Sequence, residues 1–141
     1  MSLEIVRRQD ESAERFLGEH EREALRTFYG FPVVPHEQTH SVSALADGVL
    51  AGVGRMRISA SLGRIEAVVV EAARRRRGIG RALVDGLAEI ARYYNCHKLT
   101  IEVPHRSAAQ AFFQACGFHE EVVLPQHDFK IDMAVMRKFL L

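Results

Sequence analysis

The sequence has few cysteines, no long apolar run and almost no net charge. Two cysteines, Cys96 and Cys116, are too few for a disulfide framework, so a reducing cytoplasm is the expected location. No apolar run approaches the roughly 18 residues of a membrane span, and the N-terminus lacks a signal-peptide core. The formal net charge of +1 argues against a globally basic nucleic-acid binder. We therefore expect a soluble cytoplasmic protein with no membrane and no nucleic-acid partner.

The chain also lacks internal repeats and low-complexity segments. Its 141 residues are enough for one domain, residues 1–141, that buries roughly two thirds of its unfolded surface without disulfides or metal. A composition with 48% hydrophobic and 26% charged residues is ordinary for a globular protein. Because the net charge is small, any electrostatic function must be local.

The first half of the chain predicts helical structure followed by a hairpin. Asp47-Gly48 is a favoured two-residue hairpin turn between two apolar runs. Asp10 is a candidate helix cap, and Gly30 and Pro32 end regular structure. The expected elements are a short strand at Ile5 and Val6, a helical region that divides in two at residues 18–21, a loop over 30–39, and strands over 41–46 and 49–53.

The second half alternates strands and helices. Residues 79–94 keep apolar side chains at helical spacing, and Ser107 with Gln110 fits a capping box. The expected elements are a central strand over 64–71, a helix over 79–94, a strand over 98–103, a helix from Ser107 to Gly117, and a last strand over 129–135. A hairpin followed by strand-helix-strand order predicts an α/β fold with a mixed, mostly antiparallel sheet flanked by helices.

Residues 74–81 carry the most informative pattern, four arginines followed by Gly-Ile-Gly-Arg. They stand between the apolar run 67–70 and the helix over 79–94. A strand that runs into a cationic, glycine-containing turn at the start of a helix offers unpaired backbone N–H groups and positive charge. Such a turn suits a phosphorylated ligand, and its glycines let the backbone approach the phosphate closely.

Residues 68–118 resemble the GCN5-related N-acetyltransferase (GNAT) family. The family fingerprint Q/R-x-x-G-x-G/A is met by Arg75-Arg76-Arg77-Gly78-Ile79-Gly80. A second family element, N-x-x-A-x-x-F-Y-x-x-x-G-F, is matched in part by Arg106, Ala109, Phe112, Phe113, Gly117 and Phe118. Two elements in the right order and at the usual separation are far more specific than either alone. The resemblance extends more weakly over the whole chain.

The resemblance implies acetyl-CoA as co-substrate and no metal. The amides of residues 76–81 would hold its pyrophosphate, arginines would add charge-assisted contacts, and the central strand would bind the pantetheine arm. An N–H of Val68 or Val70 would polarise the thioester carbonyl. The implied cofactor-binding residues are Val68, Val69, Val70, Arg75, Arg76, Arg77, Gly78, Ile79, Gly80, Arg81, Arg106 and Phe113.

Transfer to an amine requires removal of a proton, because an alkylammonium group has a pKa of about 10. Glu66, four residues before Val70, is the expected base, and the alternative is a solvated residue on the polar face of a strand. Phe113 stands where many relatives carry the tyrosine that protonates the leaving thiolate. His105 is a candidate substitute acid or substrate contact, and the alternative is an ordinary loop histidine.

The function implied is transfer of an acetyl group from acetyl-CoA directly to a primary amine of a small molecule or peptide. Acidic residues in segments 20–40 and 119–128 favour a cationic acceptor. Dimers are common among relatives, so a homodimer is one expected assembly. Three alternatives stay open. One is a non-catalytic CoA-binding module, one is nucleic-acid binding through Arg74–Arg77, and one is a zinc hydrolase using His36 and His40 of an H-E-x-x-H match.

Overall fold

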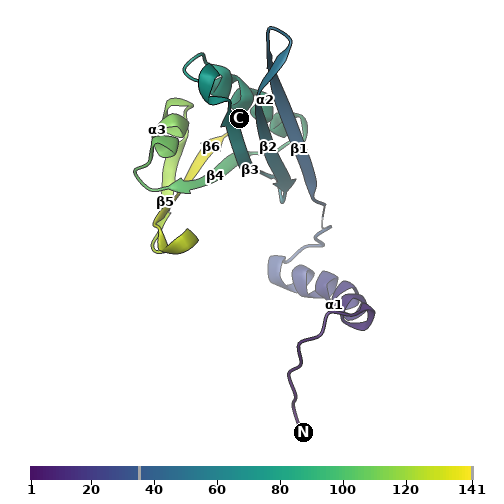
Figure 1. Ribbon diagram of the computed structural model, residues 1–141. Coiled ribbons are helices and arrows are strands. Elements are labelled where there is room, and N and C mark those ends of the chain that lie inside the picture. The colour runs from purple at the N-terminus through teal and green to yellow at the C-terminus, as the bar shows by residue number, and fades with distance from the viewer. Residues whose placement is uncertain (35, 141) are drawn as a thin grey trace. The chain divides into compact units, whose positions relative to one another are not determined.

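The computed structural model describes residues 1–34 and 36–140. Residue contacts divide the chain into two compact units, Met1–Pro35 and His36–Leu141 (Figure 1). Within its described residues, 1–34, the first unit contains one helix, α1 (Glu11–Tyr29). No helix in the described residues is long and apolar enough to cross a lipid bilayer.

Helix α1 begins and ends where the sequence indicates, but it is continuous. Asp10 accepts a hydrogen bond of 2.9 Å from the N–H of Ala13, and Gly30 ends the helix at φ 80°. The predicted division at residues 18–21 is wrong, because one internal glycine costs only about 1 kcal/mol and does not break a helix capped at both ends. The predicted strand at Ile5 and Val6 is also wrong, since these residues pair with no strand in the described structure.

The second unit is a six-stranded sheet with the strand order β1-β2-β3-β4-β6-β5. Among the described residues, only β3 and β4 are parallel neighbours, and the other four strand pairs are antiparallel. The prediction of a mixed, mostly antiparallel sheet is confirmed. The strands are β1 (Gln38–Ala46), β2 (Val49–Ser59), β3 (Leu62–Val70), β4 (Lys98–Pro104), β5 (His119–Leu124) and β6 (Met133–Phe139).

The predicted hairpin forms, and its second strand is longer than expected. Asp47 and Gly48 join β1 to β2 with φ values of 54° and 78°, as a two-residue hairpin turn of the favoured hand requires. Strand β2 continues past residue 53 to Ser59, where Ala60 and Ser61 turn the chain with φ values of 52° and 63°. The two central residues of this second turn include no Asn, Asp or Gly.

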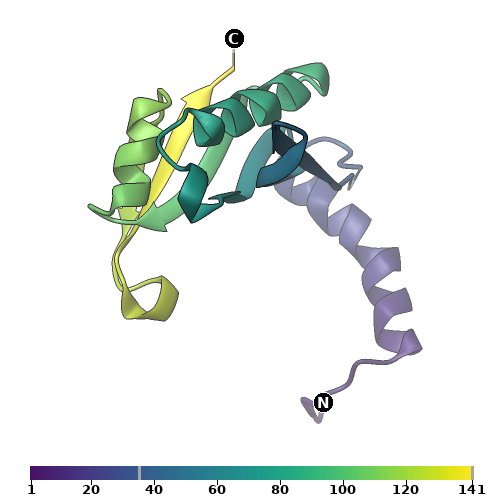
Figure 2. The same cartoon turned by 45° about the horizontal axis from the view of Figure 1, so that its top comes forward.

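Helices α2 (Ile79–Tyr93) and α3 (Ala108–Ala115) lie on the same face of the sheet (Figure 2). A Cβ atom on Gly63 of β3 would meet Leu99 of β4 and Ala91 of α2, which places the buried side of β3 and β4 under α2. The core is built from both helices and this side of the sheet. Its largest fully buried side chains are Phe118, Met56, Leu87, Leu99, Met136 and Val84.

The predicted last strand starts four residues too early, and β5 was not predicted. Residues 128–130 form a short 3₁₀ turn, in which Phe129 has φ 52° and is 95% exposed. The alternation from Phe129 onward therefore begins in a turn and becomes a strand only at Met133, where β4 and β5 supply partners. Strand β5 begins with the polar residues His119-Glu120-Glu121, which do not show the apolar alternation of a strand. Charged residues are common in such a position because β5 lies at the edge of the sheet.

Candidate functional site

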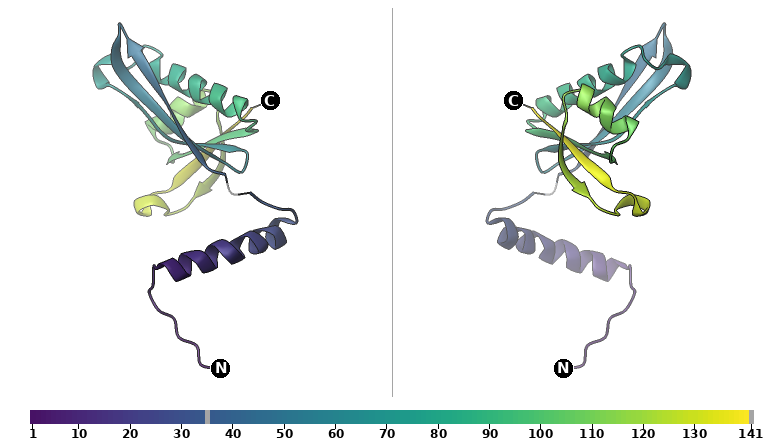
Figure 3. Two further views of the ribbon diagram at one scale, coloured as in Figure 1. Left: turned by 90° about the vertical axis from the view of Figure 1, so that its right-hand side faces the viewer. Right: turned by 90° about the vertical axis from the view of Figure 1, so that its left-hand side faces the viewer.

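Strands β3 and β4 separate soon after they meet. Their parallel pairing covers Leu62–Arg64 against Lys98–Thr100, and β3 runs on to Val70 with only β2 as a partner in the described structure. The two halves of the sheet diverge from this point (Figure 3). The side of β3 that faces away from β2 therefore has free backbone groups beyond residue 64.

The backbone groups on this side belong to Val68 and Val70. The N–H of Glu71 donates to the carbonyl of Ala51 on β2 at 2.8 Å, so Glu71 and Val69 direct their backbone groups toward β2. By alternation, Val68 and Val70 direct theirs away from β2. We call these groups the open edge of β3. The Arg75 Nε already uses this edge, because it donates to the Val70 carbonyl at 3.3 Å.

The turn after β3 leads directly into the N-terminus of α2. Arg76 and Gly78 adopt φ values of 65° and 80°, and the first hydrogen bond of the helix runs from the Ala82 N–H to the Gly78 carbonyl at 3.0 Å. The N–H groups of residues 79–81 consequently have no partner within the helix. These N–H groups and the positive end of the helix dipole suit an anion.

Gly80 lets α3 approach the start of α2. A Cβ atom on Gly80 would lie 3.0 Å from Cζ and 3.1 Å from Cε1 of Phe112. The sequence suggested Phe113 for a cofactor contact, but Phe113 is only 4% exposed and stacks edge-on against Phe112 and Phe118. Phe112 is thus the aromatic side chain that α3 places beside the glycine turn.

The four consecutive arginines do not form one patch. Arg74 lies against the β1–β2 hairpin, where its Nη1 is 3.4 Å from the Ala46 carbonyl and its Nε is 3.6 Å from Glu71. Arg75 bonds Val70, as described above. Arg76 and Arg77 are exposed. Two of the four guanidinium groups are therefore turned toward the protein's own backbone, which weakens the nucleic-acid alternative.

Glu66 occupies a β-bulge in β3. Arg55 of β2 pairs with Ala67 and Met56 pairs with Ile65, so Glu66 is the extra residue. Its carboxylate lies 3.6 Å from Arg55 Nε, and its side chain is 36% exposed. Val70 faces α2 together with its partner Gly52, so the alternation places Ala67 and Arg55 on the opposite face of the sheet. Glu66 reaches solvent on that opposite face.

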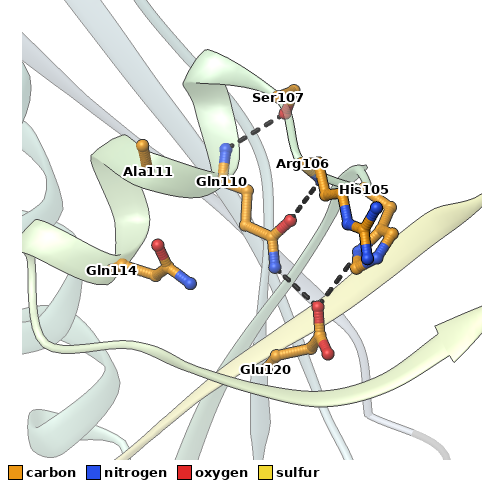
Figure 4. A pocket seen from close by; sticks show the side chains of 7 residues that line it. All are labelled: His105, Arg106, Ser107, Gln110, Ala111, Gln114 and Glu120. Atoms are coloured by element: carbon orange, nitrogen blue, oxygen red, sulfur yellow. Dashed lines mark hydrogen bonds and ion pairs between the residues drawn. The ribbon is translucent and has the colours of Figure 1, made fainter.

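His105 directly follows β4, and its ring lies beside Glu120 of β5. Its Nδ1 is buried, has no hydrogen-bond partner among the described residues, and forms a close 3.1 Å contact with Oε1 of Glu120 on β5 (Figure 4). In the strand order, β6 and β5 lie on one side of β4 and β3 lies on the other. The structure therefore brings His105 to Glu120, on the β5 side of β4.

Gln110 links the backbone of Arg106 to Glu120 on β5. Its Oε1 accepts a 2.6 Å hydrogen bond from the Arg106 N–H, and its Nε2 donates to Glu120 Oε1 at 2.7 Å. Ser107 caps α3 as predicted, accepting from the Gln110 N–H at 3.1 Å, but the Gln110 side chain reaches the Arg106 N–H and not that of Ser107. A pocket of about 320 Å³ opens beside this network, lined by His105, Arg106, Ser107, Gln110, Ala111, Gln114 and Glu120 (Figure 4).

The H-E-x-x-H match is not in a helix. His40 is in β1 and His36 precedes it, and Gln38 lies between them with hydrogen bonds of 2.7 Å to His36 and 2.9 Å to His40. A zinc protease needs both histidines on one helical face, so this alternative loses its structural context. Elsewhere, Glu102, His127 and Asp128 hold possible ligand atoms within 4.8 Å of one another, and all three are exposed.

Both cysteines are free and buried. Burial raises the pKa of the Cys96 and Cys116 thiols. For Cys116 the charges of Arg81 and Lys138 act in the opposite direction, and burial outweighs them. No disulfide joins them in the described structure, and neither thiol has the character of a nucleophile.

Residues 5–118 match the model of the Acetyltransferase (GNAT) family. The chain is 37% identical over 68 residues to a protein from Oryza sativa subsp. japonica named "Probable glucosamine 6-phosphate N-acetyltransferase 2". That match covers 48% of this chain and 40% of the rice protein, so the aligned stretch spans less than half of that relative.

The fold is also found among solved acetyltransferases. An acetyltransferase from Bacillus cereus superposes with a TM-score of 0.73 at 15% identity, covering 97% of this chain and 98% of that one. A ribosomal-protein-alanine N-acetyltransferase from Brucella melitensis superposes with a TM-score of 0.62 at 27% identity, covering 87% of this chain and 77% of that one. The family match spans most of the sequence and includes the glycine turn, the open edge of β3 and α3, and the chain therefore belongs to the acetyltransferase (GNAT) family.

Proposed function

We propose that this chain transfers an acetyl group from acetyl-CoA directly to a primary amine. The observation that carries the proposal is the arrangement of one strand and one helix. The open edge of β3 at Val68 and Val70 leads within a few residues to the unpartnered N–H groups that start α2. A long ligand with an amide-containing arm and a diphosphate needs both features side by side.

In the proposed complex, the diphosphate is bound by the N–H groups of residues 79–81 and by the exposed Arg76 and Arg77. The pantetheine amides pair with the open edge of β3. The Arg75 side chain, which donates to the Val70 carbonyl, gives up that hydrogen bond to the incoming arm. The space around Gly78 is open to the diphosphate, because even a Cβ atom at this position would meet no other atom within 4 Å.

The reaction joins the amine nitrogen to the thioester carbonyl carbon and breaks the carbon–sulfur bond. The electron pair of that bond leaves with the CoA thiolate, and one proton leaves the nitrogen. A Val68 or Val70 N–H stabilises the negative oxygen that forms on the carbonyl. Because a thiol has a pKa of about 8.5, the thiolate can leave without being protonated. The scheme therefore needs no acid at the position of Phe113, which is buried.

Glu66 is the proposed acceptor of the amine proton. It is the extra residue of the bulge on β3, it is solvent-accessible, and it lies two residues before Val68. His105 receives no step in this scheme, because its ring lies against Glu120 on the β5 side of β4. Arg106, in the turn between β4 and α3, remains a proposed contact for the cofactor.

The acceptor is proposed to be a cationic primary amine. The rice relative is named for glucosamine 6-phosphate and the Brucella relative for an alanine of a ribosomal protein, so these two chemistries belong in the first panel of substrates, together with a polyamine. The single-domain organisation over residues 1–141, the cytoplasmic location and a possible homodimer remain parts of this proposal.

The test is a thiol-release assay with acetyl-CoA over that panel, paired with calorimetry of CoA binding. Glu66→Gln should lower kcat by at least about 100-fold near neutral pH and leave CoA affinity unchanged. Glu89→Gln, which changes an exposed carboxylate on α2, is the control and should not alter turnover. Unchanged turnover in Glu66→Gln would exclude that residue as the base. CoA binding without turnover on any amine would favour the non-catalytic module, and absence of CoA binding would refute the proposal.

A further inference from the structure

The polar network at the start of α3 has a buried residue at its centre. Gln110 is 5% exposed, and both ends of its side-chain amide are hydrogen-bonded. Its Nε2 also lies 3.5 Å from the sulfur of Met136 on β6. A buried amide is costly unless its donors and acceptors are satisfied, so this network holds Gln110 in one orientation.

The Gln110 amide in turn holds the backbone of Arg106. Arg106 has φ 60°, a left-handed conformation that residues other than glycine seldom adopt. Its N–H is bonded to Gln110 Oε1 at 2.6 Å, and the neighbouring N–H of His105 donates to the Asp132 carbonyl at 2.9 Å. The β4–α3 turn is therefore tied to α3 through Gln110 and to the residues before β6 through His105.

The same network determines how α3 sits against α2. Gln110 and Phe112 are two residues apart, so their side chains leave α3 in nearly opposite directions. Gln110 is bonded to Glu120 on β5, and Phe112 packs against Gly80 at the start of α2. A rotation of α3 about its axis that released Gln110 from Glu120 would also displace Phe112 from the glycine turn.

We propose that Gln110 and Glu120 are positioning residues for CoA binding. Through the Arg106 backbone and the rotation of α3, they hold the β4–α3 turn and Phe112 beside the α2 N-terminus. This inference rests on the proposed function, because it assumes that CoA binds at that N-terminus. Neither residue contacts the reacting atoms, so their loss should affect cofactor affinity and leave the chemical step intact.

The test measures acetyl-CoA KM, kcat and CoA affinity in matched variants. Gln110→Met keeps the volume and removes both hydrogen bonds, and Glu120→Leu removes the acceptor. Each should raise KM and the CoA dissociation constant about tenfold, equivalent to about 1.4 kcal/mol, with kcat within about twofold of the native enzyme. Glu120→Gln keeps an acceptor oxygen and should restore native values. Gln114→Ala is the control, since Gln114 lines the same pocket without a hydrogen bond to the residues drawn in Figure 4.

Amide hydrogen exchange tests the same arrangement without any ligand. The Arg106 N–H should be protected in the native protein and in Glu120→Gln, and should exchange rapidly in Gln110→Met. If the native protein binds CoA and folded Gln110→Met and Glu120→Leu keep its affinity, the positioning role is refuted while the proposed function survives. If the native protein does not bind CoA, the proposed function itself is refuted and this inference with it.

Discussion

Replacing Gly80 with alanine tests how closely α3 packs against the glycine turn. The added Cβ would lie 3.0 Å and 3.1 Å from two ring carbons of Phe112, and an aromatic ring cannot bend away. Overpacking of this kind costs about 1–3 kcal/mol, and the better helix propensity of alanine offsets at most about 1 kcal/mol. We expect Gly80→Ala to lower the free energy of unfolding by about 1 kcal/mol and the melting temperature by about 2–4 °C.

The matched control for this change is in the same helix. A Cβ on Gly86 would lie 3.6–3.9 Å from side-chain atoms of Val42, which is ordinary contact, so Gly86→Ala should stabilise the protein by up to about 1 kcal/mol. In a double-mutant cycle, Phe112→Leu should relieve the cost of Gly80→Ala, because it removes the crowded ring atoms. Thermal and urea unfolding followed by circular dichroism measure these differences. If Gly80→Ala stabilises as much as Gly86→Ala, the ring does not pack where the structure places it.

Two further predictions concern charge. Replacing Arg76 and Arg77 together by alanine should weaken CoA binding about tenfold and make the affinity less sensitive to salt, because exposed pairings are each worth up to about 1 kcal/mol. Arg74→Ala should leave CoA affinity unchanged, since the Arg74 guanidinium lies against the hairpin carbonyls. Calorimetry of CoA binding at two ionic strengths measures both effects. An equal loss of affinity in the two variants would contradict this assignment of the arginines. Burial raises the pKa of the Cys96 and Cys116 thiols, so maleimide should label them slowly in the native state and quickly in urea. Stability should also fall as the pH rises above about 8.5, because the unfolded state releases these protons first, and pH-independent unfolding up to pH 10 would count against this.

Elements with a local signal were predicted well. The helix over 79–94 carries its own apolar periodicity, the Asp47-Gly48 turn prefers positive φ values, and Pro104 ends β4. Elements that form only through contact with neighbouring strands were not predicted. Strand β5 is recognisable only once β6 is beside it, and the turn at residues 128–130 interrupts an alternation that otherwise looks continuous.

The candidate site follows the same division. The glycine-arginine turn is contiguous, so its residue types alone predict an anion site at the start of a helix. The roles of its individual arginines are not contiguous, because Arg74 turns to the hairpin and Arg75 to Val70. Phe112 and Phe113 are adjacent and equally aromatic, and only the packing of α3 shows that Phe112 meets Gly80 while Phe113 lies in the core.

The amino-acid sequence by itself determined the family resemblance, the mixed sheet and the cationic turn, because each depends on residue types at short and regular spacing. The tertiary structure alone decided where β3 parts from β4, which backbone groups of β3 are left free, and how Glu120 on β5 comes to hold Gln110 on α3. These features depend on strand register and helix rotation. Both are determined by the packing of segments far apart in the chain, and no local pattern encodes them.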